Sequence, residues 1–170
     1  SDIEHARTYY TGKKGWSDAQ FAEEVRGAPQ RQALYAEPHR RWFADFAREH
    51  GVALATHDDT TLAHVDEARA MGASMSEFPT TLEAARHAHR HGLKTVAGAP
   101  NVVRGGSHSG NVSAITLARE GVLDGLSSDY VPGSLLQAAW CLHGDAGFSL
   151  PEALQVVSRG PAEAAGLPDR

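Results

Sequence analysis

The sequence of residues 51–170 predicts an α/β fold, in which helices cover a parallel sheet. Short runs rich in β-branched and small residues alternate four times with segments of helical periodicity. The four runs are VALATH, ASMSEF, KTVAGA and DGLSSD. Their ends lie about 20 to 31 residues apart, which leaves room for a helix and two turns in each connection. We therefore expect four consecutive βα units.

Each predicted strand is followed by a predicted helix. The helical segments are LAHVDEARAMG, TLEAARHAHRHG, NVSAITLAREG and SLLQAAWCLHG. A final helix, SLPEALQVVSRGPAEAAG, is expected to begin at a Ser149 cap, with Pro151 and Glu152 in its first turn. Because no low-complexity linker divides the chain, we expect one domain.

Residues 1–50 lack the βα pattern and are expected to form a helical segment that leads into the sheet. Apolar residues at three- and four-residue spacing predict three helices: SDIEHARTYY, SDAQFAEEVRGA and QRQALYAEPHRRWFADFAREHG. Ser17 is the expected N-cap of the second helix, and Gly51 is the expected end of the third. Pro38 is expected to kink or divide the third helix near Glu37.

Composition excludes several classes of partner and site. Sixteen Lys and Arg against 21 Asp and Glu give a net charge of -5, so we expect no nucleic-acid or membrane binding. The single cysteine, Cys141, excludes an internal disulfide framework and a cysteine-based zinc site; its apolar surroundings predict simple packing. A cytoplasmic location fits these features. The first ten residues show neither an initiator Met nor a signal-peptide pattern, so we expect the chain to be part of a longer protein.

Polar residues occur where the predicted strands end. His57, Asp58 and Asp59 follow the first strand, Glu77 follows the second, and Asp129 follows the fourth. Strand ends of one polarity meet at the same edge of a parallel sheet, where α/β proteins bind ligands. Imidazole and carboxylate ligands suit a divalent metal such as Zn, Mn, Fe or Mg.

We therefore expect His57, Glu77 and Asp129 to bind a divalent metal. Asp58 and Asp59 are candidates for orienting His57 or for binding a cation that arrives with the substrate. Each ligand also has a structural alternative. His57 and Asp129 could cap the turns that follow them, and Glu77 could form a salt bridge.

The longest predicted strand-end loop is APNVVRGGSHSGN, residues 99–111. Its glycines allow backbone amides to approach an anion, its hydroxyls and amide add donors, and its arginine offers a bidentate fork for phosphate. We expect it to bind the phosphates of a small-molecule substrate. The alternative is a flexible surface loop. The candidate residues are Arg104, Gly105, Gly106, Ser107, His108, Ser109 and Asn111.

Two other arrangements are weaker candidates. His87, His89 and His91 lie on a charged helix and are predicted to form a solvated face rather than a metal site. Ser127 and Ser128 lie near Asp129 in sequence, but no nucleophile-elbow motif surrounds them, which argues against a catalytic serine.

Several strings together resemble a known family. They are THDDTT, SEFPTT, GAPNVVRGGSHSGN, LSSDYVP and GPAEAAGLPDR. They are similar to the amidohydrolase superfamily, and within it to the branch that acts in phosphonate metabolism through the carbon-phosphorus lyase pathway. The resemblance implies a metal-dependent (β/α)8 TIM barrel that hydrolyses a phosphoanhydride of a nucleotide-like ribose triphosphate and releases pyrophosphate. In that frame the four strands are the fifth to the eighth of the barrel.

The resemblance also implies roles for individual residues. His57 matches the fifth-strand histidine ligand, and Asp129 matches the eighth-strand aspartate that binds metal and takes a proton from the attacking water. Glu77 stands where many relatives have a second histidine. The first-strand His-x-His pair and the fourth-strand bridging ligand have no counterpart in this chain.

A barrel of this type needs about 250 residues, so we expect the chain to be the C-terminal half of one, inactive alone. Such a half is expected to form a homo-oligomer or to associate with the missing half of the barrel. Two alternative functions remain at this point. One is a carbon-nitrogen hydrolase of the same superfamily, against which the phosphate-type loop argues. The other is a non-catalytic half-barrel that binds a phosphorylated ligand.

Overall fold

The structure, a computed structural model, describes residues 3–107 and 110–169. Its chain forms two compact units, Ser1–Phe43 and Ala44–Arg170. The second unit contains the sheet and every strand-end residue discussed above. The expectation of one domain stays a prediction.

The first unit contains helix α1 (Ile3–Gly12) and most of helix α2 (Asp18–His50). The predicted cap at Ser17 is confirmed: the Gln20 amide donates to Ser17 Oγ (3.2 Å), and the Ser17 amide donates to Gln20 Oε1 (2.8 Å). This reciprocal pair satisfies two amides that the helix itself leaves without partners.

The prediction of three helices in residues 1–50 is wrong, because α2 runs unbroken for 33 residues with Pro29 and Pro38 inside it. A proline removes one amide donor and crowds the preceding turn. The helix continues on both sides of each proline. Most of it is exposed, so water can hydrogen-bond to the backbone carbonyl groups that have no amide donor. The helix ends before Gly51, which has a φ of 63° and confirms the predicted stop.

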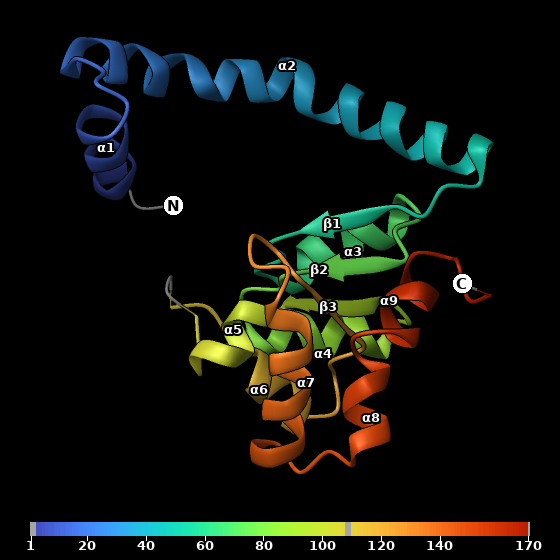
Figure 1. The fold of residues 1–170 in the computed structure, drawn as a ribbon. Helices are drawn as coiled ribbons and strands as arrows, with labels where there is room; N and C mark the ends of the chain where they lie inside the picture. The colour runs from blue at the N-terminus through green and yellow to red at the C-terminus, as the bar shows by residue number, and fades with distance from the viewer. Residues whose placement is uncertain (1–2, 108–109, 170) are drawn as a thin grey trace. The chain divides into compact units, whose positions relative to one another are not determined.

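The second unit contains a parallel sheet of four strands in the order β1-β2-β3-β4 (Figure 1). The strands are β1 (Ala55–His57), β2 (Met75–Glu77), β3 (Lys94–Gly98) and β4 (Gly125–Ser127). The predicted α/β fold with four parallel strands is therefore confirmed. Neighbours in the sheet are also neighbours in sequence, which is the order of a singly wound barrel; a doubly wound sheet would reverse its order partway. The sheet is thus compatible with half of a barrel.

Helices follow each strand of this sheet, and α4 to α8 lie along one of its faces in Figure 1. They are α3 (Leu62–Ala70), α4 (Leu82–Arg90), α5 (Ala99–Arg104), α6 (Ala114–Arg119), α7 (Ser134–Asp145), α8 (Leu150–Gln155) and α9 (Arg159–Ala164). Ala97 and Leu126 on the sheet belong to the same buried cluster as Leu117 and Leu142 on the helices. Cys141 is partly buried against this cluster, as its apolar surroundings predicted.

Strand alternation places His57 and Glu77 on one face of the sheet and Ala97 and Leu126 on the other. Ala97 pairs with Leu126 in the register, whereas His57 pairs with Glu77 and Glu77 with Val96. Successive side chains of a strand point to opposite faces. His57 and Glu77 therefore lie on the face opposite the helix-covered core.

The single final helix that the sequence predicts is instead two, α8 and α9. A Cβ placed on Gly160 would lie 1.9 Å from the carbonyl oxygen of Asp124, so only glycine fits at this close approach to the segment before β4. At the break itself, the Val156 carbonyl accepts a hydrogen bond from the Leu126 amide of β4 (2.6 Å), so the chain bonds to the sheet where sequence periodicity alone would continue the helix. The capping box of α8 is confirmed, with the Ser149 amide donating to Glu152 Oε2 at 2.8 Å.

The described part of the chain contains no helix long and apolar enough to span a membrane.

Candidate functional site

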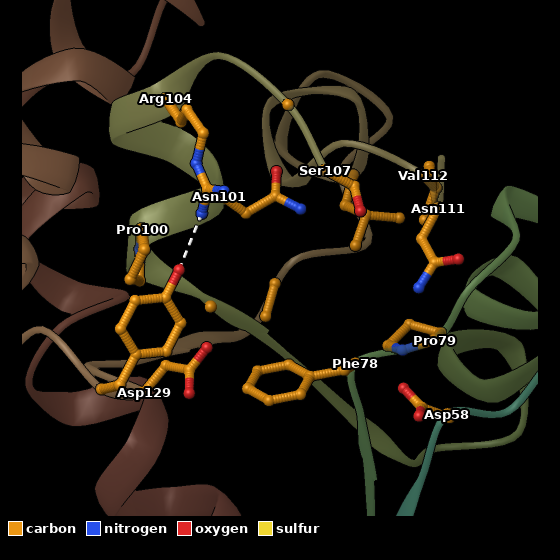
Figure 2. A pocket seen from close by; sticks show the side chains of 15 residues that line it. Asp58, Phe78, Pro79, Pro100, Asn101, Arg104, Ser107, Asn111, Val112 and Asp129 are labelled. Atoms are coloured by element: carbon orange, nitrogen blue, oxygen red, sulfur yellow. Dashed lines mark hydrogen bonds between the residues drawn. The ribbon is translucent and has the colours of Figure 1, made fainter. Parts of the chain in front are cut away.

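A cavity of about 210 Å³ lies where the carboxyl ends of the strands meet (Figure 2). Asp58, Phe78, Gly98 and Asp129 line it, each from the end of a different strand or just beyond it. We call this cavity the strand-end pocket. Of the polar strand-end residues singled out from the sequence, Asp58 and Asp129 line this cavity, whereas His57 and Glu77 do not.

The backbone is strained at three of these four positions. Asp58, Phe78 and Asp129 have φ values of 60°, 53° and 50°, and they are the non-glycine residues with positive φ in the part of the chain that the structure describes. Such conformations cost about 1 to 3 kcal/mol each and cluster at functional sites. Hydrogen bonds to neighbouring strands hold two of them, since the Asp58 amide donates to Glu77 O (3.0 Å) and the Phe78 amide donates to Val96 O (2.8 Å).

Arg104 is the cation among the described residues of the pocket lining, which also includes the carboxylates of Asp58 and Asp129. Arg104 Nη2 donates to the Tyr130 hydroxyl at 3.0 Å, the bond drawn as a dashed line in Figure 2. Tyr130 follows Asp129 directly, so one short segment positions both the carboxylate and the guanidinium.

Gly98 has no side chain and so leaves space in the pocket next to Asp129 and Phe78. A Cβ on Gly98 would lie 3.7 Å from both Asp129 Oδ2 and Phe78 Cε1. The ring of Phe78 lies between the carboxylates of Asp129 and Asp58 in the view of Figure 2. The sequence interpretation missed Phe78, Tyr130 and Gly98 as lining residues, although each adjoins a predicted strand end.

The predicted glycine-rich loop begins as a helix, so the expectation of a loop over residues 99–111 is wrong for its first half. Gly98 and Pro100 suit a helix start, and α5 continues to Arg104 before Gly105 turns the chain at a φ of 80°. Within the remainder, Gly106, Ser107 and Asn111 line the pocket together with Arg104. Gly105 is the helix C-cap, and the candidates His108 and Ser109 lie outside the described residues.

His57 and Glu77 lie side by side in the sheet register but do not line the described pocket. His57 Nε2 is 3.9 Å from Glu77 Oε2, and His57 Nδ1 is 3.2 Å from Asp58 Oδ2. The ring of Phe78 packs edge-on against the His57 ring, with centroids 5.3 Å apart. Asp58 is thus placed to orient His57, as the sequence interpretation proposed.

Asp59 has a different environment. It is 4% exposed, and its Oδ2 accepts hydrogen bonds from Thr56 Oγ1 and Ser76 Oγ, both at 2.6 Å. Thr56 and Ser76 precede His57 and Glu77 in their strands, so their side chains lie on the opposite face. Asp59 therefore links β1 to β2 through hydrogen bonds on the face opposite His57 and Glu77.

A second group of titratable side chains lies on the helices. One ligand atom each from Asp66, His87 and His91 can be chosen so that all three lie within 4.8 Å of one another. In the described part of the chain, no other group of three or more His, Cys, Asp or Glu residues has ligand atoms this close together. His57, Glu77 and Asp129 do not form such a group. We call it the α3–α4 cluster.

Neighbouring charges shift the pKa values in the α3–α4 cluster. A hydrogen bond to His87 (Nε2 to Oδ1, 2.9 Å) lowers the pKa of Asp66. Desolvation lowers the pKa of His91, and the nearby Arg69 guanidinium adds to this effect. The sequence predicted a solvated face for His87, His89 and His91, yet the His87 side chain is only 14% exposed.

The four parallel strands and their connecting helices define an α/β protein with a cavity at the carboxyl edge of its sheet. The chain is 47% identical over 169 residues to the alpha-D-ribose 1-methylphosphonate 5-triphosphate diphosphatase of Escherichia coli (strain K12). The match covers 98% of this chain and 45% of that protein, so the chain spans slightly less than half of its relative. No family model matches the chain. No solved structure matches it either.

Proposed function

We propose that this chain forms the catalytic C-terminal half of a metal-dependent (β/α)8 barrel. Its reaction would be hydrolysis of α-D-ribose 1-methylphosphonate 5-triphosphate to the 5-phosphate and pyrophosphate, in phosphonate catabolism. The similarity to the E. coli diphosphatase supports the substrate. The observation that carries the proposal is the convergence of three strained strand-end residues and Arg104 on one pocket. In this proposal the remaining strands come from polypeptide outside the chain.

Charge in the strand-end pocket indicates a bound cation. Asp58 and Asp129 supply two carboxylates, against the single guanidinium of Arg104. A triphosphate would be repelled by these carboxylates unless a divalent ion lay between them, and carboxylate and phosphate oxygens are the donors that such ions prefer. The donor set therefore fits a metal. We propose Asp129 as the ligand within the pocket lining. His57 and Glu77, whose Nε2 and Oε2 atoms lie 3.9 Å apart outside that lining, are proposed as the further ligands. A metal held there would lower the pKa of a bound water.

The residues of this chain would divide the remaining work. Asp129 accepts a proton from the attacking water, because its carboxylate faces the cavity from a fixed strand end. Arg104, held by Tyr130, neutralises the charge that develops on the phosphoryl oxygens. The amides and hydroxyl of Gly106 and Ser107, with Asn111, bind the outer phosphates.

The products of the reaction test this proposal in the full-length polypeptide. With divalent metal present, the methylphosphonate-bearing ribose triphosphate should yield pyrophosphate and the 5-phosphate in equal amounts. Release of orthophosphate alone would contradict the assigned cut. Release of ammonia from an amide or amine substrate, without any phosphate product, would instead identify a carbon-nitrogen hydrolase. Tight binding of the triphosphate without turnover would identify a non-catalytic binding module.

We also propose that the edge of β1 pairs with further strands, in the missing half of the barrel or in a second copy. The described strands pair β1 only with β2, whereas the opposite edge is partly covered, since the Leu126 amide of β4 donates to Val156 O at 2.6 Å. Unpaired strand edges promote association. Light scattering of the 170-residue chain, with a pyrophosphate assay, should show inactive oligomers. A monodisperse, active monomer of 18.1 kDa would contradict it.

A further inference from the structure

We propose that Asp66, His87 and His91 form a second metal site, which binds Zn²⁺ or a similar transition-metal ion and joins helices α3 and α4. This site is separate from the strand-end pocket, because none of its three residues lines that pocket. It therefore does not depend on the proposed reaction.

Two helices bring the ligands together. His87 lies in the last turn of α4 and His91 is its C-cap residue, so the two imidazoles stand one turn apart on the same side. Their ring centroids are 4.4 Å apart. Asp66 comes from the middle of α3, and its Oδ1 lies 2.9 Å from His87 Nε2. A histidine pair at this spacing is a known way for a helix to bind zinc.

The three ligand atoms would have to move slightly closer together to bind one zinc ion. In a tetrahedral zinc site, ligand atoms lie about 3.3 Å from one another, given metal-ligand bonds of about 2.0 Å. The three ligand atoms are already within 4.8 Å of one another. Asp66 and His91 are both exposed and can rotate, while the mostly buried His87 gives the site a fixed member.

The chemistry of the ligands selects the type of metal. Two imidazoles and one carboxylate favour zinc, cobalt or nickel over magnesium and calcium, which prefer an all-oxygen shell. Three protein ligands would leave a fourth position for water. Arg69 competes for Asp66, since its Nη1 lies 3.6 Å from Asp66 Oδ1, but this guanidinium is exposed and can move away.

The position of the site gives it a structural role. Helices α3 and α4 begin at the caps Thr61 and Thr81, just after the loops that carry Asp58 and Phe78. A metal that joins these helices would hold the C-terminal end of α4 against the middle of α3. The binding free energy would then add to the stability of the folded state.

Zinc titration of the full-length protein tests this site. The variants His91→Gln and Asp66→Asn each remove one ligand. His89→Gln is the matched control, because His89 lies on the same helix but faces Asp124, with Nδ1 3.5 Å from Oδ2. The readouts are the number of Zn²⁺ equivalents, measured by competition with a chromogenic chelator, and the zinc-dependent rise in Tm.

His91→Gln and Asp66→Asn should each lose one Zn²⁺ equivalent, or bind it far more weakly, while His89→Gln should match the wild type. Removing an outer-sphere partner of a metal ligand already costs about 10- to 100-fold in affinity, so loss of a direct ligand should cost at least that much. Equal zinc binding by all four proteins would overturn the proposal. Circular dichroism without zinc checks that each variant folds. A wild-type protein whose Tm did not change on addition of zinc would also overturn the proposal.

Discussion

The strand-end pocket and the α3–α4 cluster use the same kinds of side chain, carboxylates with imidazoles nearby, in contrasting settings. The pocket residues Asp58, Phe78 and Asp129 are held in left-handed backbone conformations. The cluster residues lie on regular helices or at a helix C-cap of ordinary negative φ. The guanidinium of the pocket, Arg104, donates to the Tyr130 hydroxyl, whereas that of the cluster, Arg69, pairs with the carboxylate of Asp66 itself.

This contrast separates a site suited to chemistry from one suited to holding helices together. Strained positions persist only where the surrounding structure enforces them, and they fix functional groups with little freedom to relax. Ligands on exposed helix surfaces can adjust around an ion but do not enclose a substrate. We therefore expect changes in the pocket to alter turnover, and changes in the cluster to alter metal content and stability.

The largest effect is expected from Asp129→Asn in the full-length protein. Asparagine tolerates the left-handed conformation of Asp129, so the backbone should stay in place while the proton acceptor is lost. Turnover should fall by about 10²- to 10⁴-fold, with triphosphate affinity largely kept. Asp145→Asn, at the exposed end of α7, is the matched control and should keep wild-type rates. A near-normal rate for Asp129→Asn would remove this residue from the mechanism.

Arg104→Ala should follow in size, because it removes the one described cation of the pocket. We expect a loss of about 2 to 4 kcal/mol in transition-state stabilisation, measured as kcat/KM for pyrophosphate release. Tyr130→Phe removes only the hydroxyl that accepts from Arg104 and should cost much less. If the two variants lost equal activity, Tyr130 itself would have to contact the substrate.

Asp59→Ala should act on stability rather than on chemistry. It removes the acceptor of the Ser76 hydroxyl and leaves the Thr56 hydroxyl only the longer bond to Met75 O (3.4 Å), which should cost about 1 to 3 kcal/mol in the free energy of unfolding. Adding Ser76→Ala to this variant should restore part of the loss, since it removes one unsatisfied donor. Urea unfolding measures both. Wild-type stability with reduced metal binding would place Asp59 in the pocket instead.

The smallest effect is expected from Arg69→Gln, which removes the competing cation from the α3–α4 cluster. The affinity for Zn²⁺ should rise by at most about fivefold, because exposed ion pairs contribute no more than about 1 kcal/mol. Arg86→Gln is the control, because this exposed arginine lies on α4 but pairs with Glu120 rather than with the cluster. A weaker affinity in Arg69→Gln would show that the arginine supports the site rather than competing for it.

The sequence alone predicted the parallel arrangement of β1 to β4, because alternating β-rich and helical runs leave few other folds. It also predicted that His57, Glu77, Asp129 and the loop from Arg104 to Asn111 come from one edge of the sheet, since that follows from strand polarity, but it did not predict that Asp58 rather than His57 lines the pocket. The helix N-caps at Ser17 and Ser149 could also be predicted from the sequence, because each depends on residues within one helical turn.

Only the tertiary structure decided how these residues contact one another. The spacing of His87 and His91 was visible in sequence, but Asp66 lies 21 residues before His87 and reaches it only through the packing of α3 on α4. The split between α8 and α9 likewise lies where Val156 accepts a hydrogen bond from Leu126 of β4, 30 residues earlier in the chain. Hydrophobic periodicity in the sequence indicates which face of a helix or strand is buried. What that face packs against depends on contacts between residues far apart in the chain.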